Sequence, residues 1–578
     1  MYSTKLLIGL LPKRFREWLK KYPLLSAYYT RSLRNVGILH AIPNQKKQDD
    51  LYCTNIKTQN RYFDQLGNNQ IEAPILLVCV YKADKQSLKA TIDSIKNLCE
   101  PFLSVLFYCP QSKTSYTQKL LKNIWPSFTI DSLITKLDGN LALELNSQSC
   151  FVIYEGDQLH RNSSKTLKRL IRPDTTIAYV DCDKINEDLV RHSPEFYPDW
   201  NPDLHLSTGY VQSGVWFSNI NMLVESKFHC RFSGTAEWFI EHYFNRHAKV
   251  IQHIPLVLLH RPEDLPNVFK ESEGNIEKQL LQLGVAEVKL RDKVLCLNWE
   301  QAISPLVSLI IPTKNGKQLV QACVESILEK STYKNFEILL VDNNSDEKEA
   351  ILYFEELSLH PQIRILNFPH EFNYSAINNF AAKYAQGEVL GLVNNDIEVI
   401  EPNWLSSMVW HVMRDDIGCV GAKLLYADGK IQHAGVVMGY GGGAGHAHKY
   451  FPGDHPGYLN RLSATQNFSA VTAACLLVMK ADFEAVGGLN ETELKIAFND
   501  VDFCLRIIAL GRRNLYCAEA VLYHHESISR GLEDTVEKRE RFDSEVVYLQ
   551  TQWGNYIQHD PAYNPNLTLR YENFSIKE

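Results

Sequence analysis

The sequence lacks any arrangement of cysteines that would indicate a disulfide framework or a zinc-binding motif. Its 13 cysteines are scattered singly, and no two of them form a Cys-x-x-Cys pair. Disulfide-rich secreted domains and zinc ribbons both use cysteines paired at short spacings. The pattern therefore indicates reduced, mostly buried thiols in a cytoplasmic protein.

An excess of positive charge is also missing. The 578 residues include 60 Lys or Arg and 67 Asp or Glu, a net charge of −7, which argues against a general nucleic-acid binder. Hydrophobic content of 45% and charged content of 22% are typical of a globular protein, so long disordered stretches are not expected. One basic patch departs from this average, because residues 1–48 carry ten Lys or Arg and a single acid, Glu17.

The same opening segment has no apolar run long enough to span a membrane, since Pro12, Lys13 and Arg14 interrupt it. It also lacks a small-residue cleavage site after a hydrophobic stretch, so no signal peptide is predicted. Two interpretations of residues 1–22 remain open. One is a basic amphipathic helix lying on an anionic membrane surface, and the other is a solvated helix packed on the protein.

The length predicts two to four domains, and a regular pattern begins near residue 305. Residues 306–311 form a predicted strand, 318–329 a helix, and 336–341 a second strand that ends at Asp342. Strand, helix and strand within so short a stretch predict a parallel, right-handed βαβ unit.

The most informative motif is Asn394-Asn395-Asp396, which follows the apolar run 389–393. A predicted helix at 373–384, capped by Gly387, leads into this strand. Continuous aliphatic sequence is typical of a strand buried on both faces, and open α/β sheets bind ligands beyond the carboxyl ends of such strands. The position suits a divalent cation, although Asp396 taken alone is equally explained as a turn residue.

Two further clusters follow. Asn499-Asp500-Val501-Asp502 is a second acidic group, and His524-His525 comes directly after a short apolar strand. Oxygen and imidazole ligands for Mg²⁺ or Mn²⁺, beside a separate carboxylate, are what transfer from a diphosphate-activated donor requires. Between Asp396 and Asn499, residues 439–446 are too rich in glycine for an element interior and predict a loop, either a lid or a plain surface loop.

The first half of the chain repeats the second in weaker form. Strands are predicted at 75–80 and 103–109 around a helix at 88–98, and the strand 150–154 ends at Glu155-Gly156-Asp157. This pattern predicts an internal duplication. Its chemistry is less complete, because Asp342 has no counterpart and Glu237 is the nearest match to Asp500.

Taken together, these motifs resemble the inverting glycosyltransferase family 2, which has the GT-A fold, and in particular its bacterial tandem-domain members that build O-antigen, capsule or related polysaccharides. The likeness covers residues 73–265 loosely and 303–570 closely. The motifs that carry it are 308–315, 341–345, 373–378, 392–396, 432–435, 486–489, 498–506 and 524–527, with 181–184 and 197–203 in the first half.

The resemblance implies a role for each matching residue. Asp396 and His524 would hold Mg²⁺ or Mn²⁺, with His525 the weaker choice, and Asp500 would be the general base, with Asp502 as the alternative. The nucleotide-binding residues it implies are Pro312, Thr313, Asn315, Asp342, Asn343, Asn373 and Asn395. A second candidate site in the first half comprises Asp157, Glu237 and His260.

The sequence thus predicts two tandem GT-A α/β domains with mixed, mostly parallel sheets, the first degenerate. The predicted boundaries are a basic helical segment at 1–48, a degenerate domain at 49–300 and a glycosyltransferase domain with a helical tail at 301–578. The expected partners are a UDP- or dTDP-linked sugar and a glycan or lipid-linked glycan acceptor. The expected location is the cytoplasm, in peripheral contact with the inner membrane.

Three alternatives remain open. A second working site at Asp157 and His260 would make the protein a bifunctional polymerase, whereas a silent first copy would serve as scaffold. Both copies being inactive would leave a glycan- or nucleotide-sugar-binding protein. A nucleotidyltransferase would need a basic phosphate-binding loop after the first strand, where only Lys314 is present.

Overall fold

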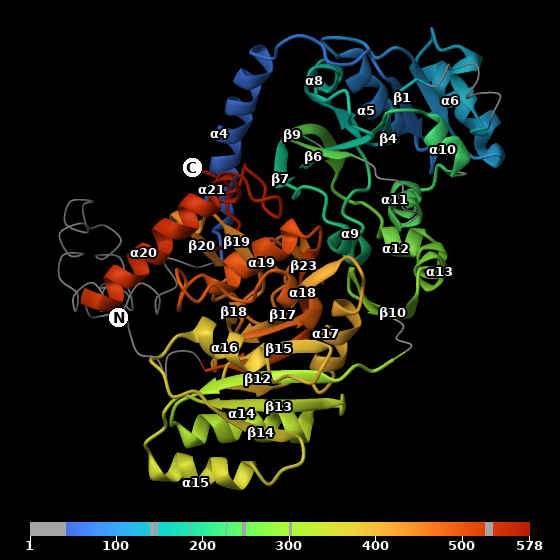
Figure 1. Cartoon of the computed structure of the whole chain (residues 1–578). Helices are drawn as coiled ribbons and strands as arrows, with labels where there is room; N and C mark the ends of the chain where they lie inside the picture. Colours follow the sequence, from blue (N-terminus) through green and yellow to red (C-terminus); the bar gives the residue numbers. More distant parts are fainter. Residues whose placement is uncertain are drawn as a thin grey trace. The chain divides into compact units, whose positions relative to one another are not determined.

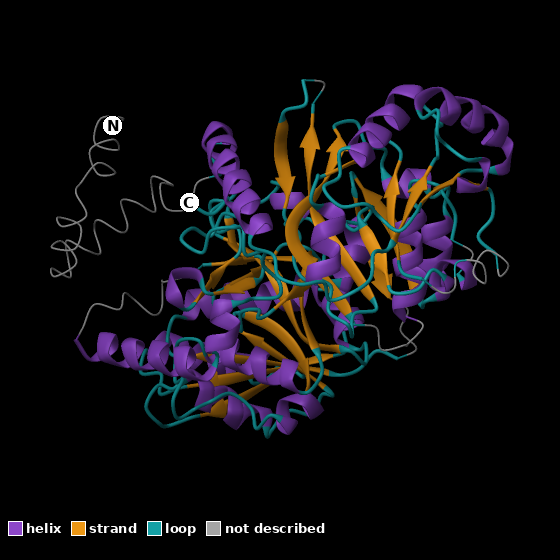
Figure 2. Ribbon diagram, turned by 90° about the horizontal axis from the view of Figure 1, so that it is seen from above, coloured by secondary structure: helices purple, strands orange, loops and turns teal. Residues whose placement is uncertain are grey.

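The computed structural model describes residues 42–138, 145, 148–186, 188–226, 228–244, 250–299, 303–525 and 536–578. They form two compact α/β units, each a sheet flanked by helices (Figures 1 and 2). The amino-terminal unit comprises residues 44–297, 563–567 and 576–578, and the carboxy-terminal unit comprises 298–562 and 568–575. Most of the predicted basic segment lies outside the described residues, so its membrane contact stays a prediction. Within the described ranges, no helix combines the length and apolarity needed to cross a bilayer.

The carboxy-terminal unit is built on a ten-stranded mixed sheet whose main order is β14-β13-β12-β15-β22-β17-β23-β16. The first four strands of this order run parallel to one another, and β22 is antiparallel to both β15 and β17. The strands are β12 (Val307–Thr313), β13 (Phe336–Asp342), β14 (Ile363–Asn367), β15 (Val389–Val393), β16 (Ile397–Val399), β17 (Ile417–Leu425), β18 (Ile431–His433), β21 (Gln466–Phe468), β22 (Cys475–Met479) and β23 (Arg513–His524).

Helices cover both faces of this sheet, which explains why its strands read as continuous hydrophobic runs. Leu309 and Ile311 point into one core, while Ile310 points into the other, because successive side chains of a strand face opposite ways. One face carries α14 (Lys317–Lys330), α15 (Lys348–Leu357) and α17 (Trp404–Val412). The other carries α16 (Tyr374–Ala382), α18 (Lys480–Ala485), α19 (Asn499–Ala509) and α20 (Val536–Gln552), and α21 (Gly554–Gln558) follows.

The centre of this sheet tolerates no side chain at Gly391. A Cβ atom there would lie 2.6 Å from Leu309 Cδ2 and 3.0 Å from Leu477 Cδ2, on the two neighbouring strands. We expect Gly391→Ala to lower the free energy of unfolding by about 1–3 kcal/mol through overpacking. Chemical denaturation would measure this, with Gly554→Ala as the control, since no atom lies within 4 Å of a Cβ built there. Equal stability of the two variants would contradict the expectation.

The amino-terminal unit repeats the same topology. Its nine-stranded sheet has the order β3-β2-β1-β4-β8-β6-β9-β5, and each step along this order is parallel or antiparallel as in the other sheet. This confirms the predicted fold class, two tandem GT-A-like α/β domains. The strands are β1 (Ile75–Cys79), β2 (Val105–Tyr108), β3 (Leu133–Ile134), β4 (Cys150–Tyr154), β5 (Gln158–Leu159), β6 (Ile177–Ile185), β7 (Arg191–Glu195), β8 (Val215–Phe217) and β9 (Ile251–Pro262).

Its helices and a small separate sheet complete the unit. The helices are α4 (Gln45–Asp64), α5 (Lys85–Lys96), α6 (Thr114–Ile124), α8 (Ser163–Leu170), α9 (Pro202–Thr208), α10 (Asn221–Glu225), α11 (Gly234–Phe244), α12 (Val268–Glu271) and α13 (Asn275–Gln282). The two-stranded sheet pairs β10 (Val285–Arg291) with β11 (Val294–Trp299).

Two local predictions were wrong. The helix expected to reach residue 384 ends at Ala382, and Gly387 does not cap it; a Cβ on Gly387 would instead lie 2.4 Å from the Leu306 carbonyl oxygen. The glycine-rich stretch is not simply a loop, because β19 (Val436–Met438) and β20 (Ala444–His446) form an antiparallel hairpin. Gly439, Gly441 and Gly442 adopt positive φ angles in the tight connection between these strands.

Candidate active site

The carboxyl ends of three adjacent parallel strands meet in the carboxy-terminal unit. Thr313 at the end of β12 is opposite Asp342 at the end of β13. Asn395, just beyond β15, donates from Nδ2 to Thr313 Oγ1 at 3.0 Å, and both residues are buried. The sheet therefore gathers the polar residues that end these strands along one edge.

The loops after β12 and β13 hold each other in place. Asn315 has a φ of 56° and accepts the backbone N–H groups of Asp346 and Glu347 at 2.8 and 3.0 Å. Asp342 Oδ1 accepts both the backbone N–H and the hydroxyl of Ser345, at 3.0 and 2.5 Å. These bonds fix the shape of the rim on which Asp342 is presented.

Three other residues expected to bind nucleotide are engaged within the protein, two by hydrogen bonds and one by burial. Asn343 is buried and donates to the carbonyls of Phe368 and His370. Asn373 caps α16 by accepting the Ala376 N–H at 3.0 Å. Pro312 is buried within β12. Each of the three shapes the edge of the sheet.

Asp396 and His524 come together at the end of β15 and β23. His524 Nε2 lies 3.2 Å from Asp396 Oδ1, and both side chains are 6% exposed. The contact lacks hydrogen-bond geometry, so Asp396 Oδ1 is a buried atom without a hydrogen-bond partner among the described residues; the other ring nitrogen of His524, Nδ1, has none there either. His525 turns to Glu398 instead, at 3.2 Å. An unsatisfied carboxylate oxygen beside an imidazole nitrogen fits a divalent cation.

Asn394 and Tyr374 extend this cluster. Asn394 Nδ2 lies 3.3 Å from His524 Nε2, and Asn394 Oδ1 accepts the Tyr374 hydroxyl at 3.2 Å. The same hydroxyl lies 2.9 Å from the Ala473 carbonyl oxygen. Burial raises the pKa of Tyr374, and the nearby charges of Asp500 and Asp396 raise it further. Tyr374 therefore stands between the two acids as a neutral phenol.

Asp500 reaches the same edge from the first turn of α19. Its Oδ2 accepts the Ala473 N–H at 3.1 Å, while the neighbouring Ala474 carbonyl accepts the Asn394 N–H at 2.9 Å. Burial raises the pKa of the Asp500 carboxyl, against the opposing hydrogen bonds from Ala473 and Thr472. The structure thus brings Asp396, His524 and Asp500 to one end of the sheet.

Asp502, the alternative base, has a different environment. It is 1% exposed, its Oδ2 pairs with Arg506 Nε at 2.8 Å, and its Oδ1 accepts Trp553 Nε1 at 2.9 Å. Because α19 turns residues two apart in different directions, Asp502 points away from the turn at Ala473 that contacts Asp500. Both of its oxygens are committed to the packing of α19.

Two histidines near the site were not assigned to it from the sequence. His433 donates from Nδ1 to the Ala422 carbonyl at 2.9 Å and accepts the Thr472 N–H at Nε2. Burial, with a smaller effect of His524, lowers the pKa of His433 to about 4. His446 packs edge-on against it at 5.2 Å. The motif 432–435 already contained a signal for His433, whereas the glycine-rich pattern hid the strand that carries His446.

The equivalent edge of the amino-terminal unit is arranged differently. Asp157, which follows β4 as Asp396 follows β15, accepts the Ser213 hydroxyl and lies 3.8 Å from Arg261 Nε. His260 turns instead to Asp183, with 2.6 Å between Nδ1 and Oδ1. Asp157 and His260 therefore do not pair with each other as Asp396 and His524 do.

Glu237 lies in a local network on α11. It accepts from the Ser233 hydroxyl at 2.5 Å and pairs with His229 Nε2 at 2.8 Å. Burial acts to raise the pKa of Glu237, but the hydrogen bonds of His229 and Ser233 and the charges of His229 and Arg231 together lower the pKa. These partners tie Glu237 to its own helix and the turn before it.

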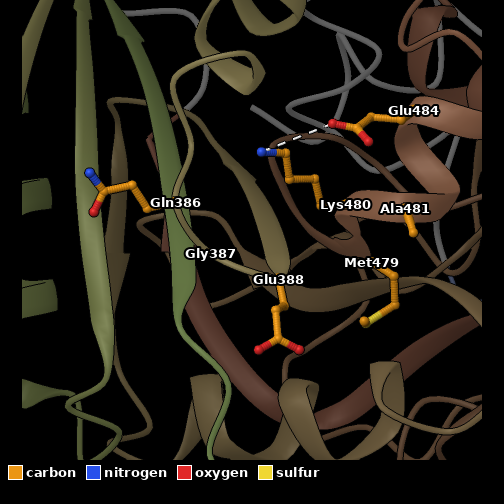
Figure 3. Close-up of a pocket in the computed structure, with 7 residues that line it drawn as sticks. All are labelled: Gln386, Gly387, Glu388, Met479, Lys480, Ala481 and Glu484. Atoms are coloured by element: carbon orange, nitrogen blue, oxygen red, sulfur yellow. Dashed lines mark ion pairs between the residues drawn. The ribbon is translucent and has the colours of Figure 1, made fainter.

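A cavity of about 380 Å³ lies elsewhere in the carboxy-terminal unit, and Figure 3 shows the residues that line it. It is lined by Gln386, Gly387, Glu388, Met479, Lys480, Ala481 and Glu484, and Lys480 Nζ lies 4.0 Å from Glu484 Oε1. Glu388 precedes the first residue of β15, whereas the acidic cluster follows the last. The cavity is therefore at the opposite end of the strand from Asp396.

Comparison with known proteins places these observations in a family. Residues 308–487 match the model described as glycosyl transferase family 2. The chain is 42% identical over 461 residues to uncharacterized protein y4gI of Sinorhizobium fredii, which is 76% of this chain and 50% of that protein. It is 33% identical over 423 residues to the O-antigen biosynthesis protein RfbC of Myxococcus xanthus, 71% of this chain and 33% of that protein.

The chain thus spans half or less of the length of these two relatives. Among solved structures, mannosyltransferase PcManGT from Pyrobaculum calidifontis, in complex with GDP-Man and Mn²⁺, aligns with a TM-score of 0.33 at 16% identity. That alignment covers 44% of this chain and 65% of the other.

Proposed function

The chain belongs to glycosyltransferase family 2, and from this premise we propose that its carboxy-terminal unit transfers a sugar, with inversion, from a nucleoside diphosphate donor to a growing cell-surface polysaccharide. The observation that carries the proposal is the convergence of Asp396, His524 and Asp500 at one edge of the sheet. The last two lie beyond the residues that match the family model, so they are independent of that match. The relative named for O-antigen biosynthesis supports the class of product.

Asp396 and His524 are the residues that would hold a divalent cation, Mg²⁺ or Mn²⁺. His524 Nε2 lies 3.2 Å from Asp396 Oδ1, and that oxygen is buried without a hydrogen-bond partner among the described residues, which fits that role. When bound, such an ion neutralises the charge that develops on a leaving diphosphate. In this proposal Asp342, at the end of β13, accepts the N–H of a uracil or thymine ring, so the expected donor is a UDP- or dTDP-linked sugar.

Asp500 acts as the general base in this proposal. Its carboxylate removes the proton of the acceptor hydroxyl while that oxygen attacks the anomeric carbon and the bond to the diphosphate breaks. The raised pKa strengthens it as a base. Because the ionised form is required, activity falls as the pH drops through that raised pKa, at a higher pH than for an ordinary aspartate. Asp502 is unsuited, since Arg506 and Trp553 occupy both of its oxygens.

A donor panel tests the proposal. UDP-, dTDP- and GDP-sugars are offered with Mn²⁺ and a lipid-linked glycan acceptor, and the released product is identified. Release of a nucleoside diphosphate supports glycosyl transfer, whereas release of pyrophosphate would indicate nucleotidyl transfer. No turnover of any donor would favour a silent binding scaffold.

The amino-terminal unit has the fold without the cation pair, and we propose that it does not catalyse transfer. The guanidinium of Arg261 lies beside Asp157, where a cation would otherwise bind. Its positive charge would repel that cation. His260 is held by Asp183, which also accepts Arg191 Nε at 2.6 Å and the Tyr52 hydroxyl at 2.5 Å. Asp157 and His260 thus each have a charged neighbour within this unit, Arg261 and Asp183 respectively.

Asp157→Asn is therefore expected to retain most of the wild-type turnover while reducing stability. Removing the charge leaves Arg261 buried with a weaker set of partners, a change that costs about 1–3 kcal/mol. Turnover per folded molecule and the midpoint of thermal unfolding would be measured side by side. A loss of turnover as large as that of Asp500→Asn would mean that both units work, as in a bifunctional polymerase.

A further inference from the structure

A second group of metal-ligating side chains lies on β23, away from the candidate active site. His411 on α17 and Cys517 and Glu519 on β23 place one ligand atom each within 4.8 Å of the others. Among the residues that the structure describes, one group of three or more His, Cys, Asp or Glu side chains has its ligand atoms this close together, and it is this group. We propose that His411, Cys517 and Glu519 form a site for a zinc ion.

The fold builds this cluster through an irregularity between β17 and β23. Ala422 is opposite Cys517, but the next residue, Lys423, is opposite Val521, so residues 518–520 bulge out of the ladder. Bulges of this kind re-aim side chains. Cys517 and Glu519 come from this bulge, and His411 comes from the last turn of α17, which packs against the same strand.

One of the proposed ligand atoms, a carboxylate oxygen of Glu519, has no hydrogen-bond partner within the described ranges and could instead coordinate a cation. Glu519 Oε1 is buried and has no hydrogen-bond partner among the residues that the structure describes. Its other oxygen, Oε2, accepts the Thr465 hydroxyl at 2.5 Å and lies 3.7 Å from Cys517 Sγ. A buried carboxylate oxygen without a partner is costly, and coordination to a cation would remove that cost.

The mixture of donors selects the type of ion. Imidazole nitrogen, sulfur and carboxylate oxygen together are typical of zinc, while Mg²⁺ and Ca²⁺ prefer oxygen alone. Burial raises the pKa of the Cys517 thiol well above its usual range, so the thiol is protonated without metal and releases its proton to solvent when the Zn–S bond forms.

Two positively charged side chains, Lys423 and Arg414, face the same region and oppose the binding of a metal ion. Lys423 donates from Nζ to the Gly453 carbonyl at 2.8 Å, and Arg414 Nη1 lies 3.4 Å from His411 Nδ1. Both repel an incoming ion, so binding needs the strong bond to a thiolate, which a hard cation does not form. The site is separate from the Asp396–His524 pair, since His524 is five residues further along β23.

Cobalt substitution tests the proposal in the full chain. After chelator treatment and dialysis, Co²⁺ is titrated and the thiolate-to-cobalt charge-transfer absorption is recorded, with Zn²⁺ expected to displace it. Cys517→Ser should abolish this absorption, and Glu519→Gln should weaken Co²⁺ binding by about tenfold or more. Cys419→Ser, which removes another fully buried thiol on β17, is the matched control and should keep the absorption.

Asp396→Asn should also keep the absorption, because neither of the proposed ligands there, Asp396 and His524, is a thiol, so failure here is distinguishable from failure of the catalytic proposal. Absence of a thiolate band in the wild type would overturn the inference, as would a band that persists in Cys517→Ser. Unchanged Co²⁺ affinity in Glu519→Gln would remove Glu519, and with it the three-ligand site.

Discussion

Asp500→Asn is expected to lower turnover by about 10²–10⁴-fold, the usual contribution of a positioned general base. The amide keeps the size of the side chain and its carbonyl can still accept the Ala473 N–H that now bonds Asp500 Oδ2. The change therefore removes the proton acceptor and leaves the fold in place. Release of nucleoside diphosphate under saturating donor and acceptor measures the effect.

Asp502→Asn is the matched control, two residues further along the same helix. It weakens the pair with Arg506 and so reduces thermal stability, while turnover per folded molecule stays close to that of the wild type. The reverse outcome, with Asp502→Asn inactive and Asp500→Asn active, would assign the base to Asp502. Full activity in both variants would rule out an aspartate base on α19.

Removal of the divalent cation is expected to cause the second-largest loss of turnover, after loss of the general base. Chelation should reduce turnover by about a thousandfold or more, since a metal contributes several kcal/mol and each 1.36 kcal/mol is tenfold in rate. Adding Mn²⁺ back should restore the wild type. It should not restore Asp396→Asn, in which the carboxylate beside His524 has lost its charge.

Direct binding separates this effect from a general loss of function. Electron paramagnetic resonance of free Mn²⁺ should show one fewer tight site in Asp396→Asn than in the wild type, with the donor present in both. Asp157→Asn provides the comparison and should keep the number of tight sites, because we propose that no cation binds beside Arg261. Undiminished turnover in the presence of chelator would show that the carboxy-terminal unit works without metal.

The strands of the carboxy-terminal sheet could be predicted because their environment leaves a clear trace in the sequence. β12, β13 and β15 are buried on both faces, so each is mostly apolar, with Ser308, Glu337 and Gly391 as exceptions, and each ends in or is followed by a polar residue. The hairpin β19–β20 leaves no such trace. Its strands have three residues each, and the glycines that permit its turn dominate the local pattern.

The grouping of Asp396, His524 and Asp500 was predicted, but the partners of individual side chains were not. Asn315 and Asn373 occupy motif positions and yet bond to neighbouring loops, a choice that depends on backbone positions far away in the chain. The same limit applies to Asp183, whose pairing with His260 spans 77 residues. Local sequence shows which groups are present, and only the assembled sheet shows which of them meet.

The pairing of β16 with β23 has a consequence for how an ion would bind. Ile397, next to Asp396, is opposite His524 in the antiparallel ladder, and the Asp396 carbonyl accepts the His525 N–H at 3.0 Å. Both ligands are thus anchored by main-chain bonds that exist before any ion arrives. Binding of the ion therefore fixes few additional side-chain torsions. Calorimetry should find a binding entropy that is dominated by water released from the ion, with little loss of motion in the polypeptide.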